Sequence, residues 1–514
     1  MAYKKSPSLL SLLFLFISFS VSAQMISRLP RSIPEAEGVS SKGILNFLDA
    51  AAKSKHEFHS LMFLRHGKVI AEGWWNPYSR DLKHTMYSLS KSFTSTAAGL
   101  AIAEKRIALS DKVISFFPDY LPDTISQNLR DLTVKHLLTM SVGQDPDPTT
   151  IIPARDTNWI KSFLALPIIN KPGSTFLYNS MATYMLSAIV QKVTGQKVID
   201  YLTPRLFNPL GIQNMDWEID PMGINTGGWG LRVKTEDMAK LGQLYLQKGN
   251  WYGKQLLPKE WVEEATTIKI LQSPEVSQSK RDSSDWLQGY CYQFWRSRHN
   301  SFRGDGAFGQ YILVLPEQDA VIAITAETAD MQDELNLVWE YLFPAIKNNK
   351  LPTNESVVQN LHKRLLSLAL PYSSKSTTSP VETDISGKTF TVNENENRIK
   401  SLMLKFSGDK CYLTVVTDTA TYKLGFSSTK WEKGETKMHG PYLLPNAKFA
   451  GLPPFKVEGN YTWKDDNTLE LTLRYVESPH SEKIICNFNK DKISVDFKNS
   501  INQKQVTIQG DLSK

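Results

Sequence analysis

The chain has 514 residues, of which 41% are hydrophobic, 11% aromatic and 22% charged, a globular composition that excludes a fibrous or broadly disordered protein. Its formal charge of +7 is spread along the chain without a basic run, so nothing favours a nucleic-acid partner. At roughly 100–200 residues per domain, the length predicts about two to four domains.

The N-terminal segment is typical of a cleavable signal peptide. Lys4 and Lys5 precede an apolar run over residues 9–21, and small residues follow it. The run is too short to span a bilayer comfortably, and no later stretch approaches the ~20 apolar residues of a stable membrane span. We therefore expect cleavage near Ala23 and a periplasmic or secreted mature chain, with a retained N-terminal anchor as the alternative.

Cysteine and histidine usage bears on cofactors and redox chemistry. Three cysteines allow at most one intrachain disulfide; Cys411 and Cys486 lie in strand-like segments and could pair, but two buried free thiols are an equal alternative to a disulfide. No Cys or His pair has zinc-ligand spacing, and neither common glycine-rich phosphate loop occurs. We expect no metal or nucleotide cofactor.

Hydrophobic patterning divides the rest of the chain into two regions. Between about residues 34 and 347 helical patterns alternate with short apolar strands, whereas beyond residue 384 period-two alternation predicts an antiparallel β-sandwich or small barrel. The polar segment between them reads as a linker that could hold a short helix near residues 357–368. The expected division is a signal peptide at 1–23, a first domain at 24–347, a linker at 348–383 and a β domain at 384–514.

Two pairs of strands flank a helical middle in the first domain. Residues 60–72 predict two strands joined by a tight turn at His66 and Gly67, and residues 311–325 predict a second pair, followed by a helix over 331–346. Helices are expected between the two pairs at 92–104, 134–140, 181–194 and 235–247. Strands from both ends of the domain therefore enclose the helical middle.

Ser88 and Lys91 are the candidate nucleophile and base. A serine is a weak nucleophile until a neighbouring base takes its proton, and side chains three residues apart on a helix share one face. The same tetrapeptide spacing occurs at Ser277, Ser407 and Ser427, but only Ser88 is followed by an apolar helix of small residues. Burial there would favour a neutral lysine that can act as a base. The alternative is a Ser/Thr-rich helix start with a surface lysine.

The segments around Ser88 resemble the class C-related branch of the serine β-lactamase and penicillin-binding-protein superfamily, which includes 6-aminohexanoate-oligomer hydrolases and family VIII-type esterases. The resemblance is carried by residues 65–68, 87–95, 134–143, 227–242 and 251–261. It implies an α/β (α+β) β-lactamase/transpeptidase-like catalytic domain, with an antiparallel sheet flanked by helices and an all-helical region. The C-terminal all-β domain loosely resembles β-rich appendages of secreted relatives, and its role stays open.

The same resemblance assigns a second active-site element, Tyr-x-Asn or Tyr-x-Ser, to Tyr178 and Ser180. A phenol near a lysine can accept a proton or relay one to a leaving group. Ser180 stands where many relatives have an amide, which implies a weaker or different contact with a substrate carbonyl. Asn179 is expected to face away from the site. The alternative for Tyr178 is a core tyrosine that precedes a helix.

The third element of β-lactamases, Lys-Thr-Gly, is missing, and Gly304, Asp305 and Gly306 stand in its place. This stretch resembles the glycine-rich third element of the esterase and oligomer-hydrolase branch, which implies that the N–H of Ala307 joins that of Ser88 in an oxyanion hole. A hairpin turn also explains these glycines, and both interpretations can hold. The aromatic residues just upstream could line an acyl pocket, although core packing is the commoner role: Trp286, Tyr290, Tyr292, Phe294 and Trp295.

These observations predict a secreted serine hydrolase that forms an acyl-enzyme with a small ester or amide, without a cofactor. The missing Lys-Thr-Gly makes strong β-lactamase activity doubtful. Within the class, a D-amino-acid carboxypeptidase that acts on a cell-wall peptide, or a β-lactamase, is the alternative. From another class, a penicillin-binding or sensing module without turnover, or an inactive scaffold, remains open. The oligomeric state cannot be read from the sequence.

Overall fold

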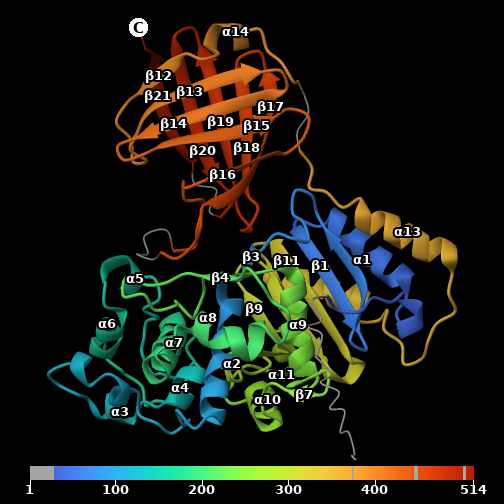
Figure 1. Cartoon of the computed structure of the whole chain (residues 1–514), viewed down its shortest axis with the longest axis vertical. Helices are drawn as coiled ribbons and strands as arrows, with labels where there is room; N and C mark the ends of the chain where they lie inside the picture. The colour runs from blue at the N-terminus through green and yellow to red at the C-terminus, as the bar shows by residue number, and fades with distance from the viewer. Residues whose placement is uncertain (1–27, 373–375, 445–449, 502–504, 514) are drawn as a thin grey trace, which may run out of the picture.

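The computed structural model describes residues 28–372, 376–444, 450–501 and 505–513. The predicted signal peptide lies outside these residues. A sheet with helices on both sides and a region of short helices form the lower part of Figure 1, and an all-β barrel lies above them. Among the described residues, no helix has the length and apolar character needed to cross a membrane.

A six-stranded antiparallel sheet organises the first domain, with β1 paired to β11 through Leu61 and Ile324. The N-terminal hairpin and the C-terminal strands therefore share one sheet, which confirms the predicted enclosure of the helical middle. The strands in spatial order are β2 (Lys68–Trp74), β1 (Glu57–Arg65), β11 (Ala320–Glu327), β10 (Gln310–Leu315), β9 (Ser301–Gly306) and β8 (Trp295–Ser297).

Alternate side chains of this sheet enter two separate cores. On one face Phe63 and Ile322 pack with α1, α12, the π-helix η7 and α13, and on the other face Met62 and Ala323 pack with α2 and α9. This alternation follows from the period of two along a strand. The bounds are α1 (Ser41–Lys53), α2 (Ser90–Ala103), α9 (Thr235–Leu246), α12 (Met331–Leu337), η7 (Val338–Leu342) and α13 (Glu355–Leu366).

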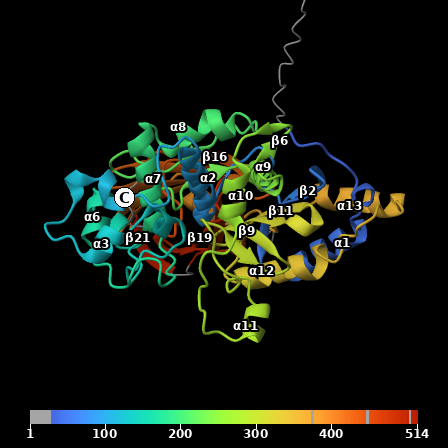
Figure 2. The same cartoon turned by 90° about the horizontal axis from the view of Figure 1, so that it is seen from below.

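The helical region lies beside the sheet and packs on α2 through α7, which begins at Ser180 and ends before Gly195. Gly195 has φ +72°, a conformation that glycine adopts without steric cost. Figure 2 shows this region next to the sheet, with the short helix α11 projecting away from both. The remaining helices are α3 (Gln127–Asp131), α4 (Val134–Leu138), α5 (Ile152–Arg155), α6 (Trp159–Ala165), α7 (Ser180–Thr194), α8 (Val198–Leu202), α10 (Lys259–Thr266) and α11 (Gln278–Asp282).

Short ladders complete the first domain. They are β3 (His84–Thr85), β4 (Asp216–Trp217) and β5 (Leu231–Val233) in one sheet, and β6 (Asn250–Trp251) with β7 (Lys254–Gln255) in another.

The segment predicted as a linker contains α13, which packs against the first domain. A Cβ added to Gly73 of β2 would lie 2.6 Å from Leu368 and 3.1 Å from Leu365, so β2 and this segment are in close contact. Leu361 is 3% exposed and belongs to the core that α1 also lines. Residues 355–370 are therefore structurally part of the first domain.

The C-terminal domain is a barrel of ten strands, which decides between the two β architectures that the sequence allowed. Nine antiparallel pairings run from β15 to β16, and the parallel pairing of Ser427 with Asn460 joins β15 to β17. The small helix α14 (Glu382–Ile385) precedes the barrel strands: β12 (Thr389–Val392), β13 (Ile399–Ser407), β14 (Lys410–Thr417), β15 (Thr421–Ser427), β16 (Glu432–Thr436), β17 (Phe455–Asp465), β18 (Thr468–Tyr475), β19 (Ser481–Asn489), β20 (Lys492–Asn499) and β21 (Gln505–Leu512).

All three cysteines are buried free thiols. Cys411 lies on β14 and Cys486 on β19, two strands that the sheet does not pair directly. Of the two alternatives that the sequence left open, the structure therefore has the free thiols.

Candidate active site

Ser88 lies in a 3-10 turn, η2 (Tyr87–Leu89), that leads directly into α2. The preceding residue, Tyr87, has φ +46°, which is unusual for a residue with a side chain. Such conformations persist where the surrounding structure enforces them, and they concentrate at functional sites. Met86 and Leu89 are fully buried and anchor the turn, whereas Ser88 is half-buried. The hydroxyl is thus held on a rigid turn that solvent can reach.

Lys91 lies one helical turn after Ser88, and its Nζ is 3.0 Å from Ser88 Oγ. The ammonium has two further partners, Ser180 Oγ at 2.9 Å and the carbonyl oxygen of Gly228 at 2.8 Å. Lys91 is only 1% exposed, and burial lowers its pKa to about 7, although the charges of Asp147 and Asp305 oppose this change. A large fraction of Lys91 is therefore neutral near neutral pH.

These three contacts are compatible with a neutral lysine. The Gly228 carbonyl can only accept a hydrogen bond, so one N–H donates to it, and the second N–H can donate to Ser180 Oγ. The nitrogen lone pair is then free to face the hydroxyl of Ser88. The contact between Ser88 and Lys91 that the Ser-x-x-Lys spacing predicts is therefore present, with a lone pair that can face the hydroxyl.

Tyr178 is the second predicted proton-carrying residue, and its ring lies beside the same pair. Lys91 Nζ is 4.7 Å from the ring centroid, and Trp295 stacks on the ring at 5.4 Å between centroids. Desolvation and the charge of Asp305 raise the pKa of Tyr178, while a hydrogen bond with Ser88 opposes the rise. The phenol consequently keeps its proton at neutral pH, which suits a proton donor better than a base.

Ser180 and Asn179 begin α7 with opposite orientations. Ser180 Oγ accepts the hydrogen bond from Lys91, so the structure places this residue on the base. The Asn179 side chain accepts a hydrogen bond from the Ala182 N–H and donates one of 2.9 Å to Gln144 Oε1, both away from Lys91. Asn179 is therefore the helix cap, as expected of a residue that faces away from the site.

The glycine-rich segment at residues 304–306 lies against η2, the turn that carries Ser88, which is called the nucleophile turn below. A Cβ on Gly304 would lie 2.7 Å from Ser92 Oγ, and a Cβ on Gly306 would lie 2.0 Å from the Met86 carbonyl oxygen. Only glycine lets β9 approach this closely. Ala307 follows at once, half-buried, in the turn that joins β9 to β10. The hairpin turn is therefore present, and the two glycines pack against Met86 and Ser92, which lie on either side of Ser88 in the sequence.

Arg303 and Asp305 occupy the positions around Gly304 as an internal ion pair. Arg303 is fully buried, and its Nε donates to Asp305 Oδ2 at 2.9 Å. Its Nη1 donates to the Asp285 carbonyl and to Ser297 Oγ. The guanidinium is committed to internal partners, so it cannot substitute for the lysine of Lys-Thr-Gly in binding a substrate carboxylate.

The aromatic residues upstream of β9 are core residues, and some of them also form a wall of the site. Tyr290, Tyr292, Phe294 and Trp295 are each at most 8% exposed. Tyr290 meets the Tyr178 ring edge to face, with centroids 6.2 Å apart, while Trp295 stacks on it. Tyr290 and Trp295 are therefore both core residues and neighbours of the Tyr178 ring.

Two residues of the site were missed by sequence reasoning. Gly228 supplies the carbonyl that binds Lys91, and a Cβ there would lie 2.7 Å from the Ser180 carbonyl oxygen. Asp147 lies close enough for its charge to act on Lys91, and its carboxylate accepts the Thr149 hydroxyl at 2.6 Å. The Gly-Gly-Trp-Gly run at residues 227–230 was a signal in the sequence that could have identified Gly228. Asp147 sits in a loop with no such pattern.

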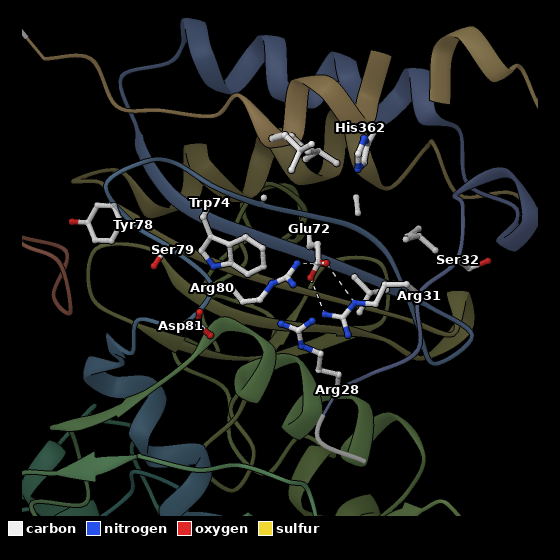
Figure 3. A pocket seen from close by; sticks show the side chains of 16 residues that line it. Arg28, Arg31, Ser32, Glu72, Trp74, Tyr78, Ser79, Arg80, Asp81 and His362 are labelled. Carbon is white, nitrogen blue, oxygen red and sulfur yellow. Dashed lines mark hydrogen bonds and ion pairs between the residues drawn. The ribbon is translucent and has the colours of Figure 1, made fainter. Parts of the chain in front are cut away.

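A cavity of about 670 Å³ lies elsewhere, between β2 and α13, and its lining does not include Ser88, Lys91 or Tyr178. Figure 3 shows Glu72 there between Arg31 and Arg80, and the salt-bridge distances are 2.9 and 2.6 Å. The central carboxylate is thus already shared by two guanidinium groups. In the part of the chain that the structure describes, no group of three or more His, Cys, Asp or Glu residues is arranged to hold a metal ion.

The sheet, the helices on its two faces and the adjoining helical region form a β-lactamase/transpeptidase-like fold. The Beta-lactamase family profile matches residues 54–343, more than half of the chain, and the chain belongs to this family. Its members are generally serine hydrolases.

Individual relatives include 6-aminohexanoate-dimer hydrolases. The 6-aminohexanoate-dimer hydrolase of Paenarthrobacter ureafaciens is 25% identical over 284 residues, which cover 51% of this chain and 71% of the relative. The Flp protein of Staphylococcus aureus strain MW2 is 26% identical over 168 residues, 30% of this chain but only 34% of Flp. A Bacillus anthracis structure, provisionally described as a 6-aminohexanoate-dimer hydrolase, has a TM-score of 0.50 and 22% identity, and the match covers 64% of this chain and 90% of that one.

Proposed function

We propose that the chain is a serine hydrolase that forms an acyl-enzyme with a small ester or amide. The observation that carries the proposal is the 3.0 Å contact between Ser88 Oγ and the buried Nζ of Lys91, whose pKa of about 7 makes it a base near neutral pH. A scaffold without activity would have no reason to keep a desolvated lysine beside an accessible serine.

In the proposed acylation step, Lys91 takes the proton of Ser88 as Oγ bonds to the substrate carbonyl carbon. The N–H groups of Ser88 and Ala307 are proposed to stabilise the oxyanion. Collapse of the tetrahedral intermediate breaks the bond to the leaving oxygen or nitrogen, to which the Tyr178 phenol gives a proton. The phenolate recovers a proton from the Lys91 ammonium. Water then attacks the acyl carbonyl carbon while Lys91 takes its proton. The bond between this carbon and Ser88 Oγ breaks, the carboxylic acid leaves, and the Lys91 ammonium returns the proton to Ser88 Oγ.

The substrate class follows from what the third element offers. Arg303 is buried in its own ion pair, so the structure gives no support to recognition of a peptide or β-lactam carboxylate at this position. The aromatic face formed by Tyr290 and Trp295 next to Tyr178 favours an apolar acyl group. An uncharged ester or amide fits these surroundings better than a cell-wall stem peptide.

The test is intact-protein mass spectrometry after exposure to a fluorophosphonate and, separately, to a fluorescent penicillin, followed by p-nitrophenyl acetate and butyrate turnover. We expect a fluorophosphonate adduct on Ser88, steady turnover, and neither adduct nor turnover in Ser88→Ala. A penicillin adduct with release of D-Ala from a stem-peptide mimic would favour the carboxypeptidase instead. A stoichiometric burst without turnover would identify a sensing module, and full activity of Ser88→Ala would refute the assignment.

We also propose that the mature chain acts in the periplasm or outside the cell. The support is the charged, apolar and small-residue order of the first 23 residues. N-terminal sequencing of the protein purified from the periplasm or medium should begin at Gln24. A cell-associated chain that keeps Met1 would contradict this proposal.

A further inference from the structure

His480, a buried residue of the C-terminal domain, contacts the turn that carries Ser88. This residue lies between β18 and β19, is fully buried, and its Nε2 is 2.6 Å from the hydroxyl of Tyr87, the residue before Ser88. Tyr87 itself is 2% exposed. A second barrel residue, Tyr442, stacks on the Tyr87 ring with centroids 5.4 Å apart. Both the ring and the hydroxyl of Tyr87 are therefore held by the other domain.

The protons of this contact can be assigned from its partners. His480 Nδ1 is 2.6 Å from Glu327 Oε1, and because a carboxylate only accepts, the ring nitrogen donates there. With the proton on Nδ1, the Nε2 lone pair can accept the O–H of Tyr87, and the two atoms are 2.6 Å apart. Burial raises the pKa of Tyr87 well above its ordinary value, so the donor keeps its proton. Hydrogen bonds therefore link Tyr87 through His480 to Glu327 at the end of β11.

His480 also contacts the third element. Its ring meets Phe308 edge to face, with centroids 4.7 Å apart, and Phe308 lies 5.5 Å from the Tyr87 ring. Phe308 directly follows Ala307, and the Thr328 N–H, next to Glu327, donates to the Phe308 carbonyl at 3.2 Å. One imidazole thus touches the sequence neighbours of both residues whose N–H groups form the proposed oxyanion hole.

The two neighbours share an unusual conformation. Tyr87 has φ +46° and Phe308 has φ +67°, a backbone conformation that is unfavourable for a residue with a Cβ. Without a partner that holds both side chains, either residue could relax to negative φ and rotate the adjacent peptide N–H. The enforced conformation therefore bears directly on where the N–H groups of Ser88 and Ala307 point.

We propose that His480 is a positioning residue that fixes the spacing of the Ser88 and Ala307 N–H groups, so that the C-terminal barrel is part of the catalytic machinery. This inference rests on the proposed serine hydrolase function. It gives the barrel a role that its sequence did not reveal.

The test compares two buried tyrosines whose hydroxyls both donate to groups of the C-terminal domain. Tyr87→Phe deletes the bond to His480. Tyr78→Phe deletes a hydroxyl that donates to the carbonyls of Ser478 at 3.1 Å and Pro479 at 3.5 Å, and it touches neither oxyanion neighbour. The readouts are kcat and KM for p-nitrophenyl acetate and the thermal midpoint. Loss of oxyanion alignment should lower kcat of Tyr87→Phe about tenfold or more with KM within about threefold. Tyr78→Phe should keep kcat within about twofold, whatever its thermal midpoint.

His480→Gln and the double variant with Tyr87→Phe extend the test. Glutamine can still hydrogen-bond Tyr87, so His480→Gln should retain a higher kcat than His480→Ala. The double variant of His480→Gln and Tyr87→Phe should lose no more kcat than the worse of its two single variants, because both substitutions act through one contact. Equal losses in Tyr78→Phe and Tyr87→Phe, or strictly additive losses, would overturn the inference while the hydrolase function stands. A wild-type chain that forms no fluorophosphonate adduct and turns over no ester would overturn both.

Discussion

Lowering the pH should switch off acylation with an inflection near pH 7. The base in the proposed mechanism is Lys91, whose burial lowers the pKa from 10.5 to about 7. Only the neutral amine can take the Ser88 proton, so the rate should follow the neutral fraction of this one group. The perturbation requires no substitution and acts on the unmodified protein.

The expected size follows from that pKa. A group with a pKa of about 7 is about nine-tenths neutral at pH 8, about one-tenth neutral at pH 6 and about one-hundredth neutral at pH 5. The second-order rate constant of acylation should therefore fall about tenfold for each pH unit below 6 and reach a plateau above pH 8. An unshifted lysine would place the inflection near 10.5, beyond the accessible range.

The assay is the rate of fluorophosphonate adduct formation, followed by intact mass at pH values from 5 to 9, with probe decay measured separately. Lys91→Arg is the matched variant, because a guanidinium stays protonated throughout and should slow acylation about 10²- to 10⁴-fold without an inflection at pH 7. Tyr178→Phe should lower the plateau but leave the inflection in place, since the phenol is a donor in this scheme. A flat profile in the wild type, or an inflection that disappears in Tyr178→Phe, would refute Lys91 as the base.

Three further predictions concern stability and packing. Because the pKa of Lys91 is lower in the folded than in the unfolded state, burying its charge costs stability in full below pH 7, and this cost vanishes as the pH rises towards 10.5. Lys91→Met should therefore raise the free energy of unfolding in urea titrations most below pH 7, by on the order of 5 kcal/mol at most. Equal gains at pH 6 and pH 10 would contradict this. Gly306→Ala places a Cβ 2.0 Å from the Met86 carbonyl oxygen and should lower the free energy of unfolding by about 1–3 kcal/mol and abolish most of the fluorophosphonate labelling. The control is Gly434→Ala in the barrel, where the nearest atom to the new Cβ is 3.6 Å away, and it should be labelled like the wild type. Thiol titration should find no reactive group in the native protein and three per chain in denaturant, and fewer than three after denaturation would point to a disulfide that the structure lacks.

Local patterns predicted the parts of the fold that local sequence controls. The short apolar runs that mark β1 and β11 and the small-residue helix α2 are present close to their expected bounds, because an apolar run and its burial are properties of consecutive residues. The barrel closure through Ser427 and Asn460 could not be read in the same way, since a single parallel pairing leaves no pattern in either strand. The packing of α13 on β2 was also missed, because a polar segment with one apolar stripe resembles a linker until its partner is known.

The same distinction applies to the site. Ser88 and Lys91 are three residues apart on one turn, so their contact followed from helical geometry alone. The contact between Lys91 and the Gly228 carbonyl spans 137 residues, and it depends on how a loop crosses the start of α2. No periodicity encodes such a crossing. Tyr87 and His480 are a still longer case, and nothing in the barrel sequence marks this histidine out from the others.

The contact between Tyr87 and His480 joins positions that are 393 residues apart. A ribosome adds about 5–20 residues per second, so roughly 20–80 s separate the synthesis of the two residues. Throughout that interval the nascent chain already carries Ser88 and Lys91, yet the imidazole that supports the nucleophile turn does not exist. The order of synthesis therefore delays the completed turn until the chain is almost finished, and a product that stops before residue 480 lacks this support permanently.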